Sequence, residues 1–406
     1  CAMATECAPK AASDLRVAPT KCPGTAPTKL GYEIKALLGS GTEGVIYVAA
    51  HRDTGRHIAL KIYRDAQAPL VEVLRLQNQE LQHECILLNQ PVVEKEGRIK
   101  VAISDLCEQD LLDMVQKQKP ARLTRDQAYA LAAQSCSGLA HAHEEGWYHL
   151  DLKPENIFMN TAENGGLQMR VADWGCATKV MPNGDCIPHS KICGTAMYWP
   201  PEVIAKGGRT SDEESLSAVD SWSLGVTILT LATGRHPWDY AIKKDEQFRA
   251  FALLRRELTE ALRQKRGKLS DAATPKGASY AQVLAKLKKL LGWPFNNSAD
   301  ALFTSVLMLL EIDAARRPSL TAMRPVFQRL HARNSARISR VVAPFAEEGE
   351  KDVLCGLVSP GTKRRHMDLT GASCPPAPSL PEDGGKRRRV ERHPTQYLSS
   401  QSTTLS

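Results

Sequence analysis

Short apolar runs separated by turn residues fill the first quarter of the chain. A glycine-rich stretch and Asp53-Thr54-Gly55 supply the first two turns. Apolar runs bounded by such residues are typical of β-strands, and three in succession predict a β-meander. The three runs span 34–38, 45–50 and 57–63, and two more strand-like runs lie near 86–88 and 99–103. Helical spacing of Leu and Val predicts one helix over 69–82.

Beyond residue 107 the pattern becomes helical. Thr124-Arg125-Asp126-Gln127 has the residue types of a capping box and precedes an Ala- and Leu-rich stretch that runs to about Glu145. Residues 217–233 form a strongly apolar helix, 246–266 an amphipathic one, and a further helix is expected near 280–291. A small β-rich part followed by a large helical part predicts an α+β fold.

The two ends of the chain lack such periodicity. Residues 1–29 are rich in Ala, Pro, Thr and Lys, which predicts a flexible leader. Residues 333–406 are polar and rich in Pro and Ser, which predicts a disordered tail. Basic runs at 363–365 and 386–389 favour a nuclear-import signal or, equally, a solubilising charged tail. The expected location is therefore cytoplasmic, nuclear or both.

Composition narrows the class of protein. The chain has 406 residues, of which 42% are apolar, so wholesale disorder is excluded. Eleven dispersed cysteines without a C-x-x-C pair indicate reduced thiols and no zinc site. No apolar run approaches the roughly 20 residues that span a bilayer, and we expect no membrane or direct nucleic-acid binding.

Positive charge is concentrated in one section. The net charge is +8, and 255–289 contain ten Lys or Arg against three Asp or Glu, which leaves +7 there. Such a section favours an acidic partner, although a solvated helix face is the more frequent explanation.

The residues with the clearest chemistry lie on one short stretch. Asp151, Lys153 and Asn156 occupy positions n, n+2 and n+5, and Asp173 follows 17 residues after Asn156. A carboxylate, an amine and a carboxamide supply a general base, a phosphate-directed cation and a metal ligand, and the second carboxylate can share the metal. A single H-x-D triplet has little meaning by itself, so the order of the whole set matters.

Two features upstream suit a nucleotide. Gly39-Ser40-Gly41-Thr42-Glu43-Gly44 lies between two predicted strands, and glycines let the backbone fold closely over phosphates. Alone, this run is equally compatible with a plain hairpin turn; a dinucleotide-binding fold would place a helix after it. Lys61 lies on the third predicted strand, 17 residues past Gly44.

Together these motifs resemble those of eukaryotic serine/threonine protein kinases over about residues 32–332. The resemblance implies a bilobal fold, with a small β-rich N-lobe at 30–106 that holds one main helix and a larger helical C-lobe at 107–332. It also implies ATP and Mg²⁺ (or Mn²⁺). The section at about 254–292 is longer than kinases usually have there and would be an extended basic insert.

The resemblance also assigns roles to single residues. Asp151 would accept or orient the proton of the substrate hydroxyl, and Lys153 would neutralise the moving phosphoryl group. Asn156 and Asp173 would hold the metal. Lys61 would reach the α- and β-phosphates and pair with a helix glutamate, for which Glu72 is our choice and Glu80 the alternative.

The implied nucleotide pocket draws on the strands and on the segment that joins the lobes. Ala59 and Phe158 would sandwich the adenine, and the backbone of Asp105 and Cys107 would bond it. Ser104 would be the gatekeeper. The remaining pocket residues are Leu38, Gly39, Gly41, Gly44 and Ile46.

Elsewhere the resemblance implies two structural anchors and the substrate class. Glu202 would form a buried ion pair with Arg317, and Asp220 would anchor the backbone of the catalytic loop. Lys153-Pro154-Glu155 and Gly194-Thr195 favour protein substrates with Ser or Thr acceptors. The rival interpretations are a pseudokinase, a small-molecule kinase and an interaction protein built around the insert.

Three positions depart from the family pattern. Leu150 stands where most members carry the arginine that receives the activation-loop phosphate, and Lys191 stands at the usual phosphate acceptor. We therefore expect activity without phosphorylation at that site, although neutral drift at position 150 and the nearby Ser190 leave alternatives open. Trp174 replaces the usual Phe and should pack near Leu76 and His149.

Overall fold

The structure is a computed structural model, and it describes residues 31–40, 44–64, 68–93, 99–162, 165–181, 183–187, 194–208, 213–267, 279–295 and 301–353. One compact unit ends at Ala332 and a second begins at Arg333. The glycine-loop tip at 41–43, the leader at 1–30 and the basic runs of the tail lie outside the described residues.

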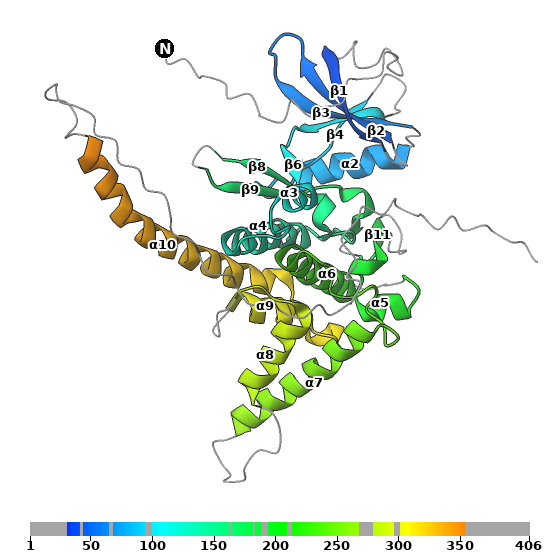
Figure 1. Ribbon diagram of the computed structural model, residues 1–406. Helices are drawn as coiled ribbons and strands as arrows, with labels where there is room; N and C mark the ends of the chain where they lie inside the picture. The colour runs from blue at the N-terminus through cyan, green and yellow to red at the C-terminus, as the bar shows by residue number, and fades with distance from the viewer. Residues whose placement is uncertain are drawn as a thin grey trace, which may run out of the picture. The chain divides into compact units, whose positions relative to one another are not determined.

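The first lobe is an antiparallel five-stranded sheet with one helix against it (Figure 1). The strand order is β1-β2-β3-β5-β4, and helix α2 (Ala68–Glu80) contacts β4 and β5. The strands are β1 (Tyr32–Ser40), β2 (Gly44–His51), β3 (His57–Tyr63), β4 (Gln90–Val93) and β5 (Ile99–Asp105). The predicted meander and helix are confirmed, but the run at 86–88 supplies only an isolated bridge from Ile86 to Val171.

The second lobe is helical, with two small sheets beside the helices. The sheets have the orders β6-β8-β9 and β7-β10-β11. Their strands are β6 (Gln109–Asp110), β7 (Trp147–Tyr148), β8 (Ile157–Thr161), β9 (Leu167–Val171), β10 (Thr178–Val180) and β11 (Cys186–Ile187). The helices are α3 (Leu111–Lys117), α4 (Arg125–Glu144), α5 (Pro201–Ala205), α6 (Glu213–Thr233), α7 (Glu246–Gly267), α8 (Tyr280–Leu291), α9 (Ala301–Leu309) and α10 (Leu320–Val353). The α+β bilobal fold is confirmed.

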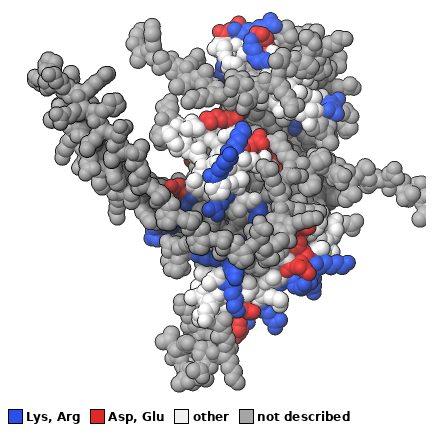
Figure 2. All heavy atoms as spheres, viewed as in Figure 1, with Lys and Arg blue, Asp and Glu red and all other residues white. Residues whose placement is uncertain are grey.

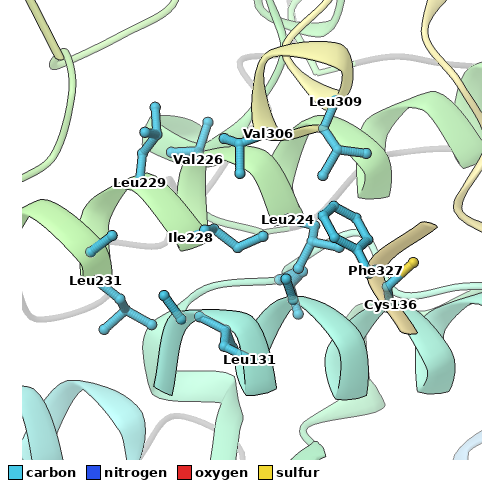
Figure 3. Close-up of a cluster of buried hydrophobic side chains, with 14 of the residues drawn as sticks. Leu131, Cys136, Leu224, Val226, Ile228, Leu229, Leu231, Val306, Leu309 and Phe327 are labelled. Carbon is cyan, nitrogen blue, oxygen red and sulfur yellow. The ribbon is translucent and has the colours of Figure 1, made fainter. Parts of the chain in front are cut away.

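The core of the second lobe forms where α4, α6 and α9 meet (Figure 3). Leu131 of α4, Leu224 and Ile228 of α6 and Val306 of α9 are all fully buried. Helix α4 begins at the predicted capping box, in which the backbone N–H of Gln127 donates to Thr124 Oγ1 at 3.3 Å. This packed centre is the support on which the loops of the site are built.

Helix α6 corrects the expectation about apolar runs. Ser215–Thr233 is long and apolar enough to cross a membrane by length and composition alone. However, 89% of its apolar window is buried inside the protein. The apolar surface is therefore used to fill the core, because this helix is surrounded by other helices.

Two further expectations differ from the structure. Helix α10 continues to Val353, so irregular structure is wrong for residues 333–353; Ala, Arg and Glu in this stretch favour helix despite its polar composition. Cys176 is disulfide-bonded, so the expectation that all cysteines are reduced is wrong at this position. Spacing along the chain does not show which cysteines the fold brings together.

Candidate active site

The backbone of the loop that carries Asp151 donates hydrogen bonds to one buried carboxylate. Asp220 of α6 is fully buried; its Oδ2 accepts from the backbone N–H of His149 at 2.7 Å, and its Oδ1 accepts from that of Leu150 at 2.8 Å. His143 Nε2 lies 2.9 Å from the same Oδ2. The predicted anchor is confirmed, and His143 is an additional partner that no sequence pattern indicated.

Polar groups of the loop converge on the carboxylate of Asp151. Its Oδ2 accepts from Lys153 Nζ at 2.7 Å and from Asn156 Nδ2 at 3.3 Å. Its Oδ1 accepts from both the backbone N–H and the hydroxyl of Thr195, each at 2.8 Å. The structure therefore brings together three of the predicted residues and adds Thr195, from the stretch between Asp173 and Glu202 that we call the activation segment.

Burial and charge act in opposite directions on Lys153. Burial lowers the pKa of its ammonium, but the neighbouring carboxylates of Asp151, Glu155 and Asp173 together outweigh this, and the pKa is raised overall. The neighbouring Glu155 is partly buried, and burial raises the pKa of its carboxyl group. Lys153 consequently stays charged at neutral pH, as a residue that neutralises a phosphoryl group must.

Glycine at position 194 lets the activation segment approach the loop. Its φ is +125°, and a Cβ there would lie 2.6 Å from the Leu150 carbonyl and 3.2 Å from Asp151 Oδ1. A side chain would thus separate Thr195 from Asp151. The Gly194-Thr195 pair is explained by this close contact.

Leu150 is buried where the family pattern has an arginine. It is 2% exposed and belongs to an apolar cluster, which we call the Leu150 cluster. The cluster contains Tyr148, Leu150, Val203, Leu216 and Val219, with Val180 and Trp199 packed against it. The leucine therefore contributes packing between the catalytic loop and the activation segment. Its backbone is left-handed, with φ +64°, which is strained for a bulky residue.

The second carboxylate lies on a similarly strained turn. Asp173 has φ +59° and is exposed. Trp174 beside it is 4% exposed, and its ring lies 4.8 Å from that of His149 in an edge arrangement. The predicted packing of Trp174 on His149 is confirmed, and Leu76 packs against the large core cluster that contains Trp174. Strained turns of this kind persist where surrounding contacts hold them.

Asn156 and Asp173 are suited to Mg²⁺. The amide nitrogen of Asn156 donates to the Asp151 carbonyl at 2.8 Å, so its amide oxygen faces the other way. One amide oxygen and one carboxylate are hard oxygen ligands, which Mg²⁺ takes together with substrate phosphates. Among the described residues no group of three or more His, Cys, Asp or Glu is placed to hold a metal.

In the hairpin between β1 and β2, which we call the glycine hairpin, Gly39 and Gly44 have different physical roles. A Cβ on Gly44 would lie 2.2 Å from the Ile62 carbonyl, so strand packing excludes any side chain. A Cβ on Gly39 would meet no described atom within 4 Å. Gly39, opposite Ile46 in the sheet, thus borders open space that suits a close-lying ligand. Leu38 is exposed on the same strand, and Gly41 lies outside the described residues.

Lys61 and the predicted pocket residues share one face of the sheet. Ala59 lies directly opposite Ser104, and Lys61 lies opposite Ile46 and Ala102. Directly opposed residues of antiparallel strands point to the same face. The ammonium of Lys61 lies 4.9 Å from the centroid of the Tyr63 ring.

The pairing of Glu72 of α2 with Lys61 stays a prediction. Its side chain lies outside the described part of α2. Glu80, the alternative, makes other contacts: its Oε2 accepts from Trp147 Nε1 at 2.7 Å and pairs with Lys179. Glu80 is therefore not available to Lys61 in this structure.

Two arginines form hydrogen bonds with the segment that joins the lobes. The carboxylate of Asp105 accepts from Arg56 at 2.8 Å and from Arg170 at 2.9 Å. Arg170 also donates to the sulfur of Cys107 at 3.4 Å, and burial raises the pKa of that thiol. Phe158 lies opposite Arg170 in the pairing of β8 with β9. Sequence spacing gave no signal for either arginine.

The end of the activation segment is locked by the predicted ion pair. Arg317, whose side chain is fully buried, donates to both carboxylate oxygens of Glu202 at 2.7 and 3.2 Å. It also donates to the Ala218 carbonyl at 2.8 Å and lies over the Trp222 ring. The pair is confirmed, and its bidentate geometry requires arginine rather than lysine.

Comparison with known proteins agrees with this geometry. The protein kinase domain family model matches residues 32–325. Similar proteins include the ovarian-specific serine/threonine-protein kinase Lok of Drosophila melanogaster, 28% identical over 221 residues, which are 51% of this chain and 44% of that protein. Serine/threonine-protein kinase ppk16 of Schizosaccharomyces pombe is 31% identical over 211 residues, 51% and 29% of the two chains. Human serine/threonine-protein kinase D3 is 30% identical over 215 residues, 51% and 23%.

The aligned part covers less than half the length of each of these relatives. All three carry the serine/threonine designation in their names. The two-lobed fold, the converging groups around Asp151 and the match over 32–325 lead to one conclusion: the chain belongs to the protein kinase family.

Proposed function

We propose that this protein is an active serine/threonine protein kinase that transfers the γ-phosphoryl group of Mg-ATP to hydroxyl groups of protein substrates. The observation that carries the proposal is the convergence of Lys153, Asn156 and Thr195 on the carboxylate of Asp151. Phosphoryl transfer depends on positioning and charge neutralisation more than on covalent chemistry. These groups supply both functions.

Each residue has a defined part in the reaction. Asp151 orients the incoming hydroxyl and accepts its proton. Lys153, 2.7 Å from Asp151, neutralises negative charge on the transferring group. Asn156 and Asp173 would hold Mg²⁺, which when bound supplies positive charge between the phosphates.

A pseudokinase is the main rival, and a radiolabel assay separates the two. The wild type and Asp173→Ala are incubated with labelled ATP and a mixture of Ser/Thr peptides. Loss of a metal ligand should reduce incorporation by about 100-fold or more. Equal incorporation by the two proteins would contradict the kinase proposal. Incorporation into small molecules but not peptides would favour a small-molecule kinase.

We further propose that activity does not require a phosphate at the usual position of the activation segment. The support is the Leu150 cluster, which provides packing where a phosphate-binding cation would otherwise lie. Lys191 and Ser190 lie outside the described residues. Phosphatase-treated protein should keep its activity, whereas a control kinase that needs the phosphate should lose it. Loss of most activity after treatment would contradict the proposal.

An acidic protein partner at the basic insert is a separate proposal. Lys286 and Lys289 line a hollow of about 600 Å³ on α8, together with Gln282 and Ala285. Figure 2 shows charges of both signs in the lower part of the view, where Figure 1 places α7 and α8. Lys286 lies 3.7 Å from Glu257. Charge reversal at Lys286 and Lys289 should abolish binding of a glutamate-rich peptide; a merely solvated face would bind none in either form.

A further inference from the structure

The last turn of helix α2 carries two polar side chains on one face. Gln77 and Glu80 are three residues apart, which places them side by side on a helix. Gln77 Nε2 donates to the Trp174 carbonyl at 3.1 Å. Glu80 Oε2 accepts from Trp147 Nε1 at 2.7 Å and forms an ion pair with Lys179. Helix α2 thus contacts the second lobe at three positions.

These positions flank the metal-binding turn and the catalytic loop. Trp174 directly follows Asp173, and Lys179 lies five residues further on in β10. Lys179 is paired with Trp147 of β7 in the sheet register, and its ammonium lies 5.6 Å from the Trp147 ring centroid. Trp147 is four residues before Asp151. The two contacts from α2 therefore hold both ends of the segment 174–179.

Burial makes these contacts stronger than ordinary surface pairs. Gln77 is 3% and Trp147 0% exposed, and the side chains of Lys179 and Glu80 are 12% and 27% exposed. A charge-assisted hydrogen bond in such surroundings is stronger than one in water. By contrast, the Glu257–Lys286 pair has a separation of 3.7 Å and side chains half exposed to solvent. That pair serves as a matched control.

We propose that Gln77 and Glu80 are positioning residues that hold the Asp173 turn and strand β10 in the arrangement needed for phosphoryl transfer. This α2 clamp, made by Gln77, Glu80, Lys179 and Trp147, rests on the proposed kinase function. It assigns to helix α2 the charged contact with the activation segment that Leu150 does not make. Neither residue touches the reacting groups, so their effect passes through Asp173 and β10.

Removal of the ion pair should lower turnover without changing peptide binding. Glu80→Gln keeps an acceptor for Trp147 but loses the charge, and Lys179→Met loses the cation. Each should reduce kcat by about 10-fold, because the competent arrangement becomes a minor population. The KM for peptide should stay the same. Lys179→Arg, which keeps the charge, should retain most of the wild-type kcat. The control Glu257→Gln should not change kcat.

Hydrogen exchange gives a second measurement that does not depend on activity. Backbone amides of 174–187 should exchange faster in Glu80→Gln than in the wild type, whereas those of α6 should not change. Unchanged exchange, a kcat within twofold of the wild type, or failure of Lys179→Arg to restore kcat would overturn the clamp. An inactive wild type with faster exchange in Glu80→Gln would instead count against the kinase function and leave the clamp supported.

Discussion

The catalytic loop and the glycine hairpin, which the proposed function assigns to one reaction site, are stabilised in different ways. In the loop, both carboxylate oxygens of Asp151 already accept hydrogen bonds, and the backbone below them is bonded to Asp220. In the hairpin, a Cβ on Gly39 would meet no described atom within 4 Å. The protein thus completes the geometry of one region itself and leaves room for a ligand in the other.

The difference follows from the chemistry that each region serves. Charge neutralisation is most effective when the donors are fixed before the reaction, because no energy is then spent on reorienting them. A nucleotide must enter and leave, so the hairpin above it needs space and a backbone that can approach phosphates. We expect substitutions in the loop to change turnover and stability, and substitutions in the hairpin to change nucleotide binding.

The largest effect is expected when the loop loses its buried anchor. Asp220→Ala removes the acceptor for two buried backbone N–H groups and leaves His143 without its carboxylate. Breaking such a buried network typically costs about 3–5 kcal/mol. Urea unfolding should show this loss, and kinase activity should fall below one hundredth of the wild type. Asp220→Asn, which keeps one acceptor oxygen, should be less affected.

The two glycines of the hairpin provide a paired test. Gly44→Ala places a methyl group against the Ile62 backbone and should destabilise the protein by about 1–3 kcal/mol. Gly39→Ala should leave the free energy of unfolding within about 0.5 kcal/mol of the wild-type value. It should, however, raise the dissociation constant for ATP several-fold, as measured by calorimetry. If Gly39→Ala bound ATP normally, the open space beside it would not be the nucleotide site.

Lowering the pH should destabilise the folded protein through His236, which packs against Tyr198 of the activation segment. His236 lies 5.0 Å from the Tyr198 ring, and its Nε2 is buried without a partner among the described residues. Burial lowers the pKa of His236 from its ordinary 6.5 to about 4. The unfolded chain therefore takes up a proton near pH 6.5, whereas the folded protein does so only near pH 4.

The free energy of unfolding should consequently fall as the pH falls through this window. Between pH 7 and pH 5 the contribution of His236 is roughly 2 kcal/mol. His236→Asn keeps a donor for the Trp238 carbonyl. In this variant the free energy of unfolding, measured with urea, should fall by that amount less between pH 7 and pH 5. An unchanged slope in the variant would assign the pH dependence to other groups.

The smallest effect is expected at the exposed side of the segment that joins the lobes. Arg56 and Asp105 form a 2.8 Å pair, but their side chains are 71% and 48% exposed. Arg56→Ala should change stability by less than about 1 kcal/mol. Arg170→Ala should cost more, because that arginine is 12% exposed and also bonds the sulfur of Cys107. Equal effects of the two substitutions in urea unfolding would contradict this ranking.

Local patterns were sufficient to predict most of the architecture. Turn residues located the first three strands, and the Thr124–Gln127 capping box located the start of α4. The tail from 333 was predicted incorrectly as far as Val353, because polar composition was given more weight than helix propensity. The expectation that no apolar run approaches the length of a membrane span was wrong for α6. A buried core helix and a membrane helix can have the same length and composition.

The sequence by itself determined the reaction class, because the order and spacing of Asp151, Lys153, Asn156 and Asp173 are chemical requirements visible along the chain. Only the tertiary structure decided what holds these residues. The Leu150 cluster gathers residues from 148 to 219. The contact of Thr195 with Asp151 joins residues 44 positions apart, and the contacts of α2 with Trp147, Trp174 and Lys179 join residues 67 to 99 positions apart. Such contacts depend on how elements pack, and local propensity and spacing contain no information about distance across a fold.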